Sequence, residues 1–308
     1  MKKFIIHFFI FILFPIIVLL VAISLPPFSG ERNTFLYSKI EKDSLLKKTK
    51  EPRLILIGGS NLALSLNSQM IKDSLNINPI NTGLDCNIGL SYMIKNTIPY
   101  IKRNDVVVIS LEYEQFYDKN MYGGYPNPII EFSISKGNLS RLDYNQFINL
   151  MKQTPSFCFS KLKIWNYFKD SYKDKSINYK RNSFNNYGDH VTHWYSPSLK
   201  PVSTKSIGKD FNPDIISALM QFNNFLKTKN SKLFISFPPF QKSSFDNNRI
   251  KLRYLYTQIE KSNLPIISYY ENYVMPDSLM FDSPYHLIKN GVDIRTNKLI
   301  IDLKKVIK

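Results

Sequence analysis

Ser60 and His286 are the residues whose surroundings best suit nucleophilic chemistry. Ser60 follows the apolar run of residues 54–57 and the pair Gly58-Gly59. A run of this length is typical of a buried parallel strand, and glycines allow the sharp turn from a strand into a helix. We therefore expect Ser60 at a helix N-terminus, where unpaired N–H groups and the helix dipole stabilise a developing oxyanion. A serine nucleophile also needs a base, and His286 is the best-placed candidate.

Each of these residues also has a purely structural explanation. Ser60 can cap the helix through its hydroxyl, because Ser is a preferred N-cap residue. His286 can be a packed loop histidine, and Asp282 can start a turn at Ser283-Pro284. The position of His286 after the last expected strand and just before the last helix favours the role of base, with Asp282 orienting it.

Bringing these residues together requires a parallel sheet. The sequence predicts strands at residues 54–57, 79–84, 105–111, 233–237 and 265–270, and helices at residues 62–75, 90–101, 212–226, 247–261 and after Gly291. The order βαβαβ, an interruption, then αβαβα predicts an α/β fold with a mostly parallel sheet and helices on both faces. Such sheets bind ligands beyond the carboxyl ends of their strands, where Ser60 and the loop of His286 both fall.

The interruption covers residues 117–211, which are rich in Tyr, Phe, Asn and Ser and have no clean period. Long aperiodic insertions are usually lids or binding loops. Asp189, His190 and His193 form an Asp-His-x-x-His group, for which polar loop residues are a commoner explanation than a metal site because no further ligands lie nearby. They are also candidates for lining the substrate cleft.

The sequence predicts five parts of the chain. These are an anchor (1–28), a tether or first short helix (29–50), two core halves (51–116 and 212–308) and the insertion between the halves (117–211).

Residues 4–25 are almost entirely apolar, with His7, Pro15 and Ser24 as the interruptions, and Lys2 and Lys3 precede them. The run is long enough to span a bilayer, which takes about 20 residues. The lysines, and the lack of a small-x-small cleavage site after the run, favour an uncleaved signal anchor over a removed signal peptide, which stays open as an alternative. We expect the anchor in the cytoplasmic membrane and the body on its extracytoplasmic side.

The formal net charge of +17 is compatible with nucleic acid, anionic lipid or acidic glycan as a neighbour. Dense blocks of Lys and Arg are lacking, which favours a general compositional bias, and nucleic acid is the least expected partner of an exported protein. The two cysteines, Cys86 and Cys158, have no framework spacing, and we expect both to be unpaired.

On these residues the chain resembles the SGNH/GDSL hydrolase superfamily, particularly its membrane-anchored members associated with envelope glycans. The matched pieces are residues 58–61, 81–89, 105–113 and 282–286, which fall at the family's successive blocks. The likeness covers about half the chain and leaves the insertion unexplained. Three positions differ from the family's pattern: Gly59 replaces the usual Asp before the serine, no Asn follows residues 105–111, and three residues instead of two separate Asp282 from His286.

The resemblance implies a flavodoxin-like (SGNH) sheet and a serine esterase or O-acyltransferase that acts on acyl groups, expected to be acetyl, of a cell-surface polysaccharide. It implies that Ser60 is the nucleophile, His286 the base and Asp282 its orienting acid. The implied oxyanion donors are Ser60, Gly83 or Gly89, and Asn61. The substrate contacts that we expect come from polar residues of the neighbouring loops, namely Asn87, Gln115, Asn185, Asp189 and His190.

No metal or organic cofactor is expected for this chemistry. The expected partners are the glycan substrate, a membrane-bound acyl-donor protein, and the membrane itself through the N-terminal helix. A second function from another class stays open: a non-catalytic glycan-binding or assembly factor on the same scaffold, which the missing Asn favours.

Overall fold

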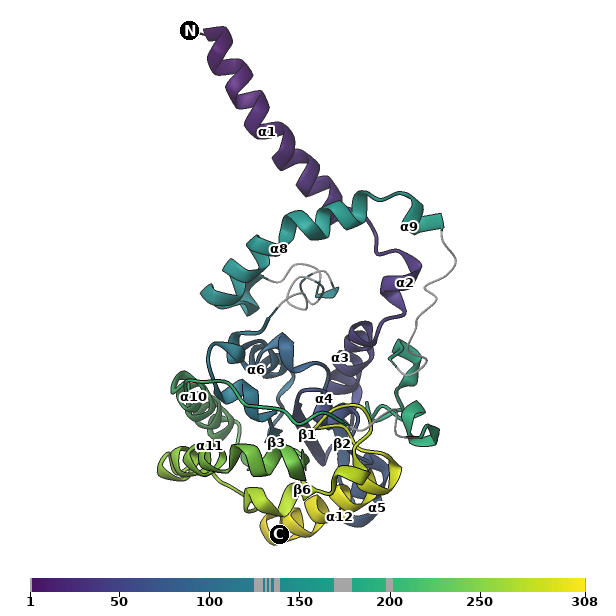
Figure 1. Cartoon of the computed structure of the whole chain (residues 1–308), viewed down its shortest axis with the longest axis vertical. Coiled ribbons are helices and arrows are strands. Elements are labelled where there is room, and N and C mark those ends of the chain that lie inside the picture. The colour runs from purple at the N-terminus through teal and green to yellow at the C-terminus, as the bar shows by residue number, and fades with distance from the viewer. Residues whose placement is uncertain are drawn as a thin grey trace.

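A four-stranded parallel sheet forms the centre of the computed structural model, which describes residues 2–124, 130, 132, 134–135, 139–168, 179–197 and 202–307 (Figure 1). The strands are β1 (Arg53–Gly58), β2 (Asn78–Asn81), β3 (Val106–Ser110) and β4 (Lys232–Ser236), in the order β2-β1-β3-β4. The prediction of an α/β fold with a parallel sheet is confirmed.

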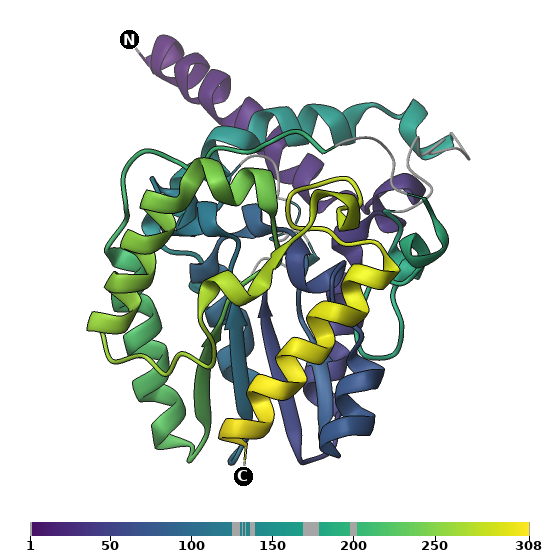
Figure 2. The ribbon, with the colours of Figure 1, turned by 60° about the horizontal axis from the view of Figure 1, so that its bottom comes forward.

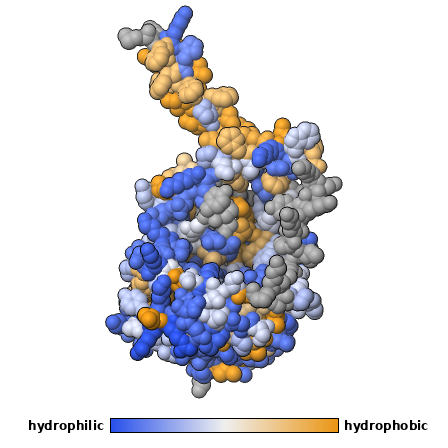
Figure 3. Space-filling model, in the orientation of Figure 1, coloured by the Kyte–Doolittle hydropathy of each residue, from blue (hydrophilic) through white to orange (hydrophobic). Residues whose placement is uncertain are grey.

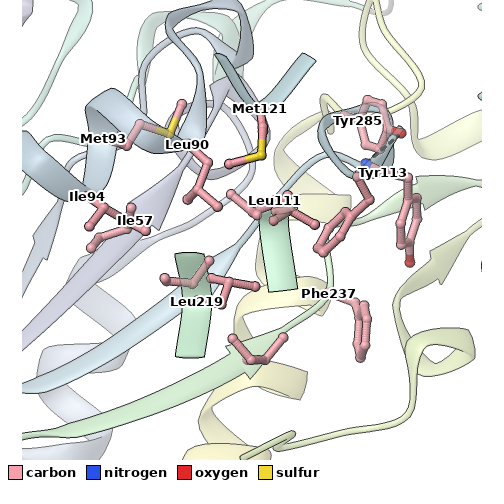
Figure 4. Packing of buried hydrophobic residues seen from close by; sticks show 14 of the residues in the cluster. Ile57, Leu90, Met93, Ile94, Leu111, Tyr113, Met121, Leu219, Phe237 and Tyr285 are labelled. Carbon is pink, nitrogen blue, oxygen red and sulfur yellow. Dashed lines mark hydrogen bonds between the residues drawn. The ribbon is translucent and has the colours of Figure 1, made fainter. Parts of the chain in front are cut away.

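Alternate residues of each strand fill two separate hydrophobic clusters, one on each face of the sheet. Ile55 and Val107 belong to one cluster, which α6 (Leu90–Thr97), α10 (Asp214–Thr228) and α11 (Lys242–Lys261) cover. Figure 4 shows part of it, where Leu90 and Ile94 lie near Ile57. Leu54 and Val108 belong to the other cluster, which α5 (Ser68–Leu75) and α12 (Lys289–Val306) cover. Helices therefore lie on both faces, as the sequence predicts.

Several elements differ from the expected ones. The helix expected at 62–75 is divided into α4 (Ser60–Ala63) and α5, because the Asn67 side chain caps a new helix start by accepting from the Met70 N–H. Pro99 lies in a 3₁₀ turn, Ile98–Tyr100, that ends the helix expected to reach residue 101.

The strand expected at 265–270 is wrong. Only one parallel bridge joins Ile266 to Ile235 of β4, and the chain then enters the 3₁₀ turn Tyr270–Tyr273, where the Tyr270 ring packs on Phe237. A separate two-stranded sheet joins β5 (Phe240–Gln241), which precedes this segment, to β6 (Val274–Met275), which follows it.

Residues 29–50 form α2 (Ser29–Arg32), a 3₁₀ turn (Phe35–Ser38) and α3 (Lys39–Lys48). Of the two expectations for this segment, the structure has the helix and not a loose tether. The Lys42 ammonium is buried and donates to the carbonyl oxygens of Asn81 and Gly188, at 2.9 and 2.6 Å. Helix α3 is thereby fixed to the end of β2 and to the insertion.

The N-terminal helix α1 (Lys2–Ser24) projects from the body (Figure 1). It is the one helix in the described part of the chain that is long and apolar enough to cross a membrane. Its C-terminal end meets α8 (Tyr144–Leu162), a 19-residue helix of the insertion, and the short α9 (Trp165–Phe168) follows. The insertion thus contains a long helix that its sequence did not reveal. Cys86 and Cys158 are both free thiols, as predicted.

Candidate active site

The structure places Ser60, His286 and Asp282 in one hydrogen-bonded row. Ser60 Oγ lies 2.8 Å from His286 Nε2, and His286 Nδ1 lies 2.7 Å from Asp282 Oδ1. This is the order of groups that a serine nucleophile, its base and the orienting acid require. The predicted approach of Ser60 and His286, which are 226 positions apart, is confirmed.

Two glycines allow Ser60 to reach this position. A Cβ atom on Gly58 would lie 2.3 Å from the Ser110 carbonyl oxygen of β3, and one on Gly59 would lie 2.8 Å from Glu112 Oε1. Neither side chain could be accommodated without moving the backbone or the carboxylate. These close contacts explain why a glycine stands directly before Ser60. Gly59 is also the N-cap of α4, so Ser60 is not merely a capping residue.

Asn61 is wrong as a predicted oxyanion donor, because its side chain is buried and already in use. Its Oδ1 accepts from the Gly59 N–H at 3.1 Å, and its Nδ2 donates to the Ser110 carbonyl oxygen at 3.1 Å. The buried guanidinium of Arg295, on α12, donates to the Asn61 carbonyl oxygen at 2.7 Å. The Asn61 side chain therefore holds the turn that presents Ser60.

The loop that carries His286 is fixed on both sides of the histidine. Ser65 Oγ donates to the Tyr285 carbonyl oxygen at 2.9 Å and accepts from the Leu287 N–H at 3.1 Å. The Tyr285 hydroxyl, which is fully buried, donates to Glu114 Oε2 at 2.6 Å. Ser65 follows α4, so one short segment positions both Ser60 and His286.

Tyr179 is a site residue that the sequence did not reveal. Its hydroxyl donates to Asp282 Oδ2 at 2.5 Å and lies 3.3 Å from His286 Nδ1. Burial opposes ionisation of the Asp282 carboxyl, but the hydrogen bond and charge of His286 and the hydrogen bond from Tyr179 outweigh it, and the pKa of Asp282 is lowered. Burial and the charge of Asp282 raise the pKa of Tyr179, which keeps its hydroxyl a donor.

Glu112 is the second unpredicted site residue, and it directly contacts Ser60. The Ser60 hydroxyl donates to Glu112 Oε1 at 2.9 Å, and the Asn61 N–H donates to the same oxygen at 3.1 Å. Glu112 is buried and comes two residues after the end of β3, within the segment where the family resemblance implies an Asn. A carboxylate of the protein therefore occupies the N-terminus of α4, the position that favours negative charge.

Two other predicted oxyanion donors are also wrong. The Gly83 N–H donates to Asn81 Oδ1 at 3.0 Å, and the Gly89 N–H donates to the Cys86 carbonyl oxygen at 3.0 Å. These amides are used to shape the loop after β2. Of the predicted oxyanion donors, the Ser60 N–H is the one that takes part in none of the hydrogen bonds described above.

The prediction that Asp189 contacts substrate is wrong, whereas the role of the half-buried Asn185 stays a prediction. The Asp189 carboxylate is fully buried and accepts from the Ser68 N–H and hydroxyl, both at 2.7 Å, and from the side-chain amides of Asn81 and Asn185. Burial raises the pKa of Asp189 despite these donors. The group joins the insertion to the start of α5 and to β2.

His190 is also buried, and the prediction that it contacts substrate is wrong. Its Nδ1 lies 2.8 Å from His193 Nδ1, and His193 Nε2 lies 2.8 Å from the Leu64 carbonyl oxygen and 3.1 Å from that of Leu287. Since carbonyl oxygens only accept, His193 carries its proton on Nε2 and accepts from His190 through Nδ1. Burial lowers the pKa of His193 to about 4. Within the described residues, no group of three or more His, Cys, Asp or Glu side chains is arranged to hold a metal ion.

The two remaining predicted contacts differ in their environment. Gln115 is wrong, because it is buried and its Nε2 donates to the Cys86 carbonyl oxygen at 3.2 Å. Asn87 is exposed in the 3₁₀ turn Cys86–Ile88, which follows β2, and its role stays a prediction.

No model of a known protein family matches the chain, and a search of curated proteins found no match either.

Proposed function

We propose that this protein is an SGNH-like serine esterase or O-acyltransferase acting on acyl groups, expected to be acetyl, of a cell-surface polysaccharide. The row Ser60-His286-Asp282 is the observation that carries the proposal. The strand order β2-β1-β3-β4, with residues 265–267 beside β4, agrees with the flavodoxin-like order 2-1-3-4-5. Ser60 follows the carboxyl end of β1, where ligands bind in such sheets.

In the proposed mechanism, Ser60 Oγ attacks the acyl carbonyl carbon while its proton passes to His286 Nε2. The tetrahedral intermediate collapses, and His286 returns the proton to the leaving alcohol oxygen, which leaves Ser60 acylated. Water or a sugar hydroxyl then gives its proton to His286 and attacks the ester carbon. The bond to Ser60 Oγ breaks, His286 returns the proton to that oxygen, and the acid or the transferred ester is released. Asp282 and Tyr179 keep the imidazole oriented, and the Ser60 N–H donates to the oxyanion.

Glu112 sets a condition on this mechanism. Its carboxylate accepts the hydroxyl proton of Ser60, which has to turn toward His286 before attack. The same carboxylate occupies the Asn61 N–H, where a second oxyanion donor would be useful. The Asn61 N–H therefore becomes a second oxyanion donor only when the substrate carbonyl oxygen displaces Glu112 from the start of α4.

The alternative is a non-catalytic glycan-binding or assembly factor, and Glu112 is the observation that favours it. A fixed negative charge beside Ser60 would repel an oxyanion and thereby disfavour ester chemistry. The two functions differ in one property, which is the reactivity of the Ser60 hydroxyl.

We also propose that α1 is an uncleaved anchor in the cytoplasmic membrane, with the body on the extracytoplasmic side. Lys2 and Lys3 precede the apolar run, and positive residues remain on the cytoplasmic side of a membrane helix. This location gives the site access to envelope glycan and to a membrane-bound acyl-donor protein.

Labelling by a fluorophosphonate, read by mass spectrometry on the full-length protein in detergent, tests the enzyme against the binding factor. We expect Ser60 to be labelled and His286→Asn to lose most of that labelling. Ser60→Ala should lose all labelling, while its melting temperature stays within a few degrees of wild type, because only one side-chain hydroxyl is lost. Ser217→Ala, on the exposed side of α10, is the matched control and should label fully. A wild-type Ser60 that stays unlabelled favours the binding factor.

A further inference from the structure

Helix α8 has its apolar residues on the wrong side for a protein surrounded by water. Five large apolar side chains on this helix are 38–76% exposed: Tyr144, Phe147, Met151, Phe159 and Leu162. They are three, four, eight and three residues apart, and Pro155 stands halfway along the longest gap, so the five share one side of the helix. The buried positions are Gln146, Leu150, Gln153, Thr154, Cys158 and Lys161, of which four carry polar side chains. A helix packed on a core shows the reverse arrangement.

The exposed apolar surface continues beyond α8. Ile164, Trp165 and Phe168, in and before α9, are 66–77% exposed. Figure 3 shows hydrophobic residues running from α1 onto the part of the body that meets it. Exposed apolar surfaces of this extent mark binding sites for proteins or membranes, because leaving them in water is unfavourable.

Contacts with α1 determine which partner fits this surface. Cys158 Sγ, on α8, lies 3.5 Å from the Leu19 carbonyl oxygen of α1. Between the two helices lies an apolar cavity of about 370 Å³, lined in part by Leu20 and Ile23 of α1 and Phe147 and Met151 of α8. The apolar side of α8 is therefore continuous with a helix that has the length and composition of a membrane span.

The height of this contact along α1 agrees with a helix in the membrane interface. Leu19 lies five residues before the end of α1 at Ser24, which corresponds to ~7–8 Å at 1.5 Å per residue. In-plane membrane helices bury their apolar face by ~5–10 Å. Trp and Tyr are also the residues that membrane interfaces favour. The Tyr167 hydroxyl donates to the Pro26 carbonyl oxygen at 3.1 Å, which holds α9 at the same level.

We propose that α8 and α9 form an in-plane membrane-binding surface that lies in the interface of the bilayer crossed by α1. The partner is the lipid bilayer itself. This inference uses the apolar stripe, the contact with α1 and its height, and it does not depend on the chemistry of Ser60.

The surface also fixes which way the domain faces. In Figures 1 and 2 the carboxyl ends of the strands, and α4 with Ser60, are on the side of the sheet toward α1 and α8. If the proposed esterase or transferase function holds, this orientation makes acyl groups on membrane-borne molecules the substrates within reach. The membrane contact can be tested separately from activity.

Tryptophan fluorescence provides that test, because the chain has two tryptophans, Trp165 and Trp194. In the full-length Trp194→Phe variant, reconstituted in phosphatidylcholine and phosphatidylglycerol vesicles, Trp165 should emit at shorter wavelength and lose most of its emission when the lipids are dibrominated. The Trp165→Phe variant is equally anchored and leaves Trp194, which packs against Lys289, as a control that should keep its emission. The proposal would be overturned if brominated lipid did not quench the Trp165 emission and aqueous acrylamide did.

A second pair of variants tests the stripe itself. In the Trp194→Phe background, Phe159→Glu places a charge on the apolar side of α8 and should reduce the lipid quenching of Trp165. Ile250→Glu makes the same change at an 87% exposed position of α11 and should not. Equal quenching in the two variants would show that the α8 stripe does not contact lipid.

Discussion

Ser60 has two hydrogen-bond partners, and only one of them favours nucleophilic attack by its hydroxyl. His286 is placed to accept its proton, whereas the Glu112 carboxylate holds the hydroxyl and the start of α4 in an arrangement that an attacking serine must leave. Gly59 is packed against the same carboxylate, so the contact is part of the local architecture. The contact between Glu112 and Ser60 therefore has opposite consequences for the two proposed functions. An esterase or transferase has to break it before attack, whereas a binding factor can keep it.

Glu112→Gln tests this residue directly. The amide removes the negative charge and can donate to the oxyanion, so we expect hydrolysis of a small activated acetyl ester to rise by roughly ten-fold or more, a fraction of what one oxyanion donor contributes elsewhere. The measurement is kcat of the purified full-length protein in detergent. Glu112→Gln combined with Ser60→Ala is the control and should be inactive. A Glu112→Gln variant that loses activity would instead show that the carboxylate takes part in catalysis.

Among the elements, the segment between α4 and α5 connects the two halves of the site. Ser65 lies in it and bonds to the backbone on both sides of His286. The ring pair His190 and His193 approaches the same region through the Leu64 and Leu287 carbonyl oxygens. Side chains that are buried behind the site thus determine where the imidazole lies.

Ser65→Ala should therefore affect orientation more than stability. Loss of one hydroxyl that makes two buried hydrogen bonds is expected to cost about 1–3 kcal/mol of unfolding free energy. We expect kcat for an activated ester to fall while KM changes little, because only the base is displaced. Ser217→Ala is the matched surface control. A variant with unchanged kcat would show that the loop is positioned without Ser65.

Prediction from sequence is most successful for residues that directly follow a buried strand. Ser60 follows a run of buried residues and two glycines, a local pattern that is sufficient to define a strand-to-helix turn. Glu112 also follows a strand, but its contact with Ser60 depends on how β1 and β3 pair, which the local pattern does not show. Tyr179 has no signal, because it belongs to an insertion without periodicity.

The largest error of the sequence interpretation, the missing α8, has a physical cause. Amphipathic helices are recognised by polar residues outside and apolar residues inside. In α8, Gln146 and Gln153 are inside and Phe159 is outside, so the usual contrast is blurred. The strand expected at 265–270 failed for a different reason, since apolar composition alone does not show where the chain turns away from β4.

At the scale of the whole molecule, His193 links acid stability to the assembly of the insertion on the core. Its pKa is lowered to about 4 by burial, although the bonds to the Leu64 and Leu287 carbonyl oxygens and the charge of Asp282 oppose this, while the charge of His286 adds to it. The unfolded chain binds a proton near pH 6.5 and the folded chain does not. The stabilisation is therefore complete above about pH 6.5 and is lost as the pH falls toward 4.

We expect the free energy of unfolding to decrease by up to about 3 kcal/mol from this group between pH 7 and pH 4. Urea unfolding of the full-length protein in detergent, followed by fluorescence at a series of pH values, measures it. His193→Gln should flatten this part of the pH dependence, although the variant is less stable at pH 7. An equally steep loss in His193→Gln would assign the acid sensitivity to other groups.

The membrane orientation is a property of the entire chain and can be tested from its far end. A fusion of alkaline phosphatase after Lys308 should be active, since that enzyme works only outside the cytoplasm, and a cytoplasmic reporter at the same position should be inactive. Moving Lys2 and Lys3 from the start of α1 to the region just after it is the informative control, because it should reduce or reverse the orientation. An active cytoplasmic reporter in the native sequence would contradict the proposed location.

The connection between α1 and α2 sets a limit on where this domain can work. Only residues 25–28 separate the two helices, and even fully extended they span no more than ~14 Å. Two of them are prolines, and the Arg32 side chain donates back to the Pro27 carbonyl oxygen at 2.9 Å. With α1 in a bilayer, the domain cannot reach outward along a long polysaccharide. If the proposed esterase or transferase function holds, the domain meets each acyl group at one height, so a growing or passing chain would be modified close to its membrane-proximal end and carry that pattern outward.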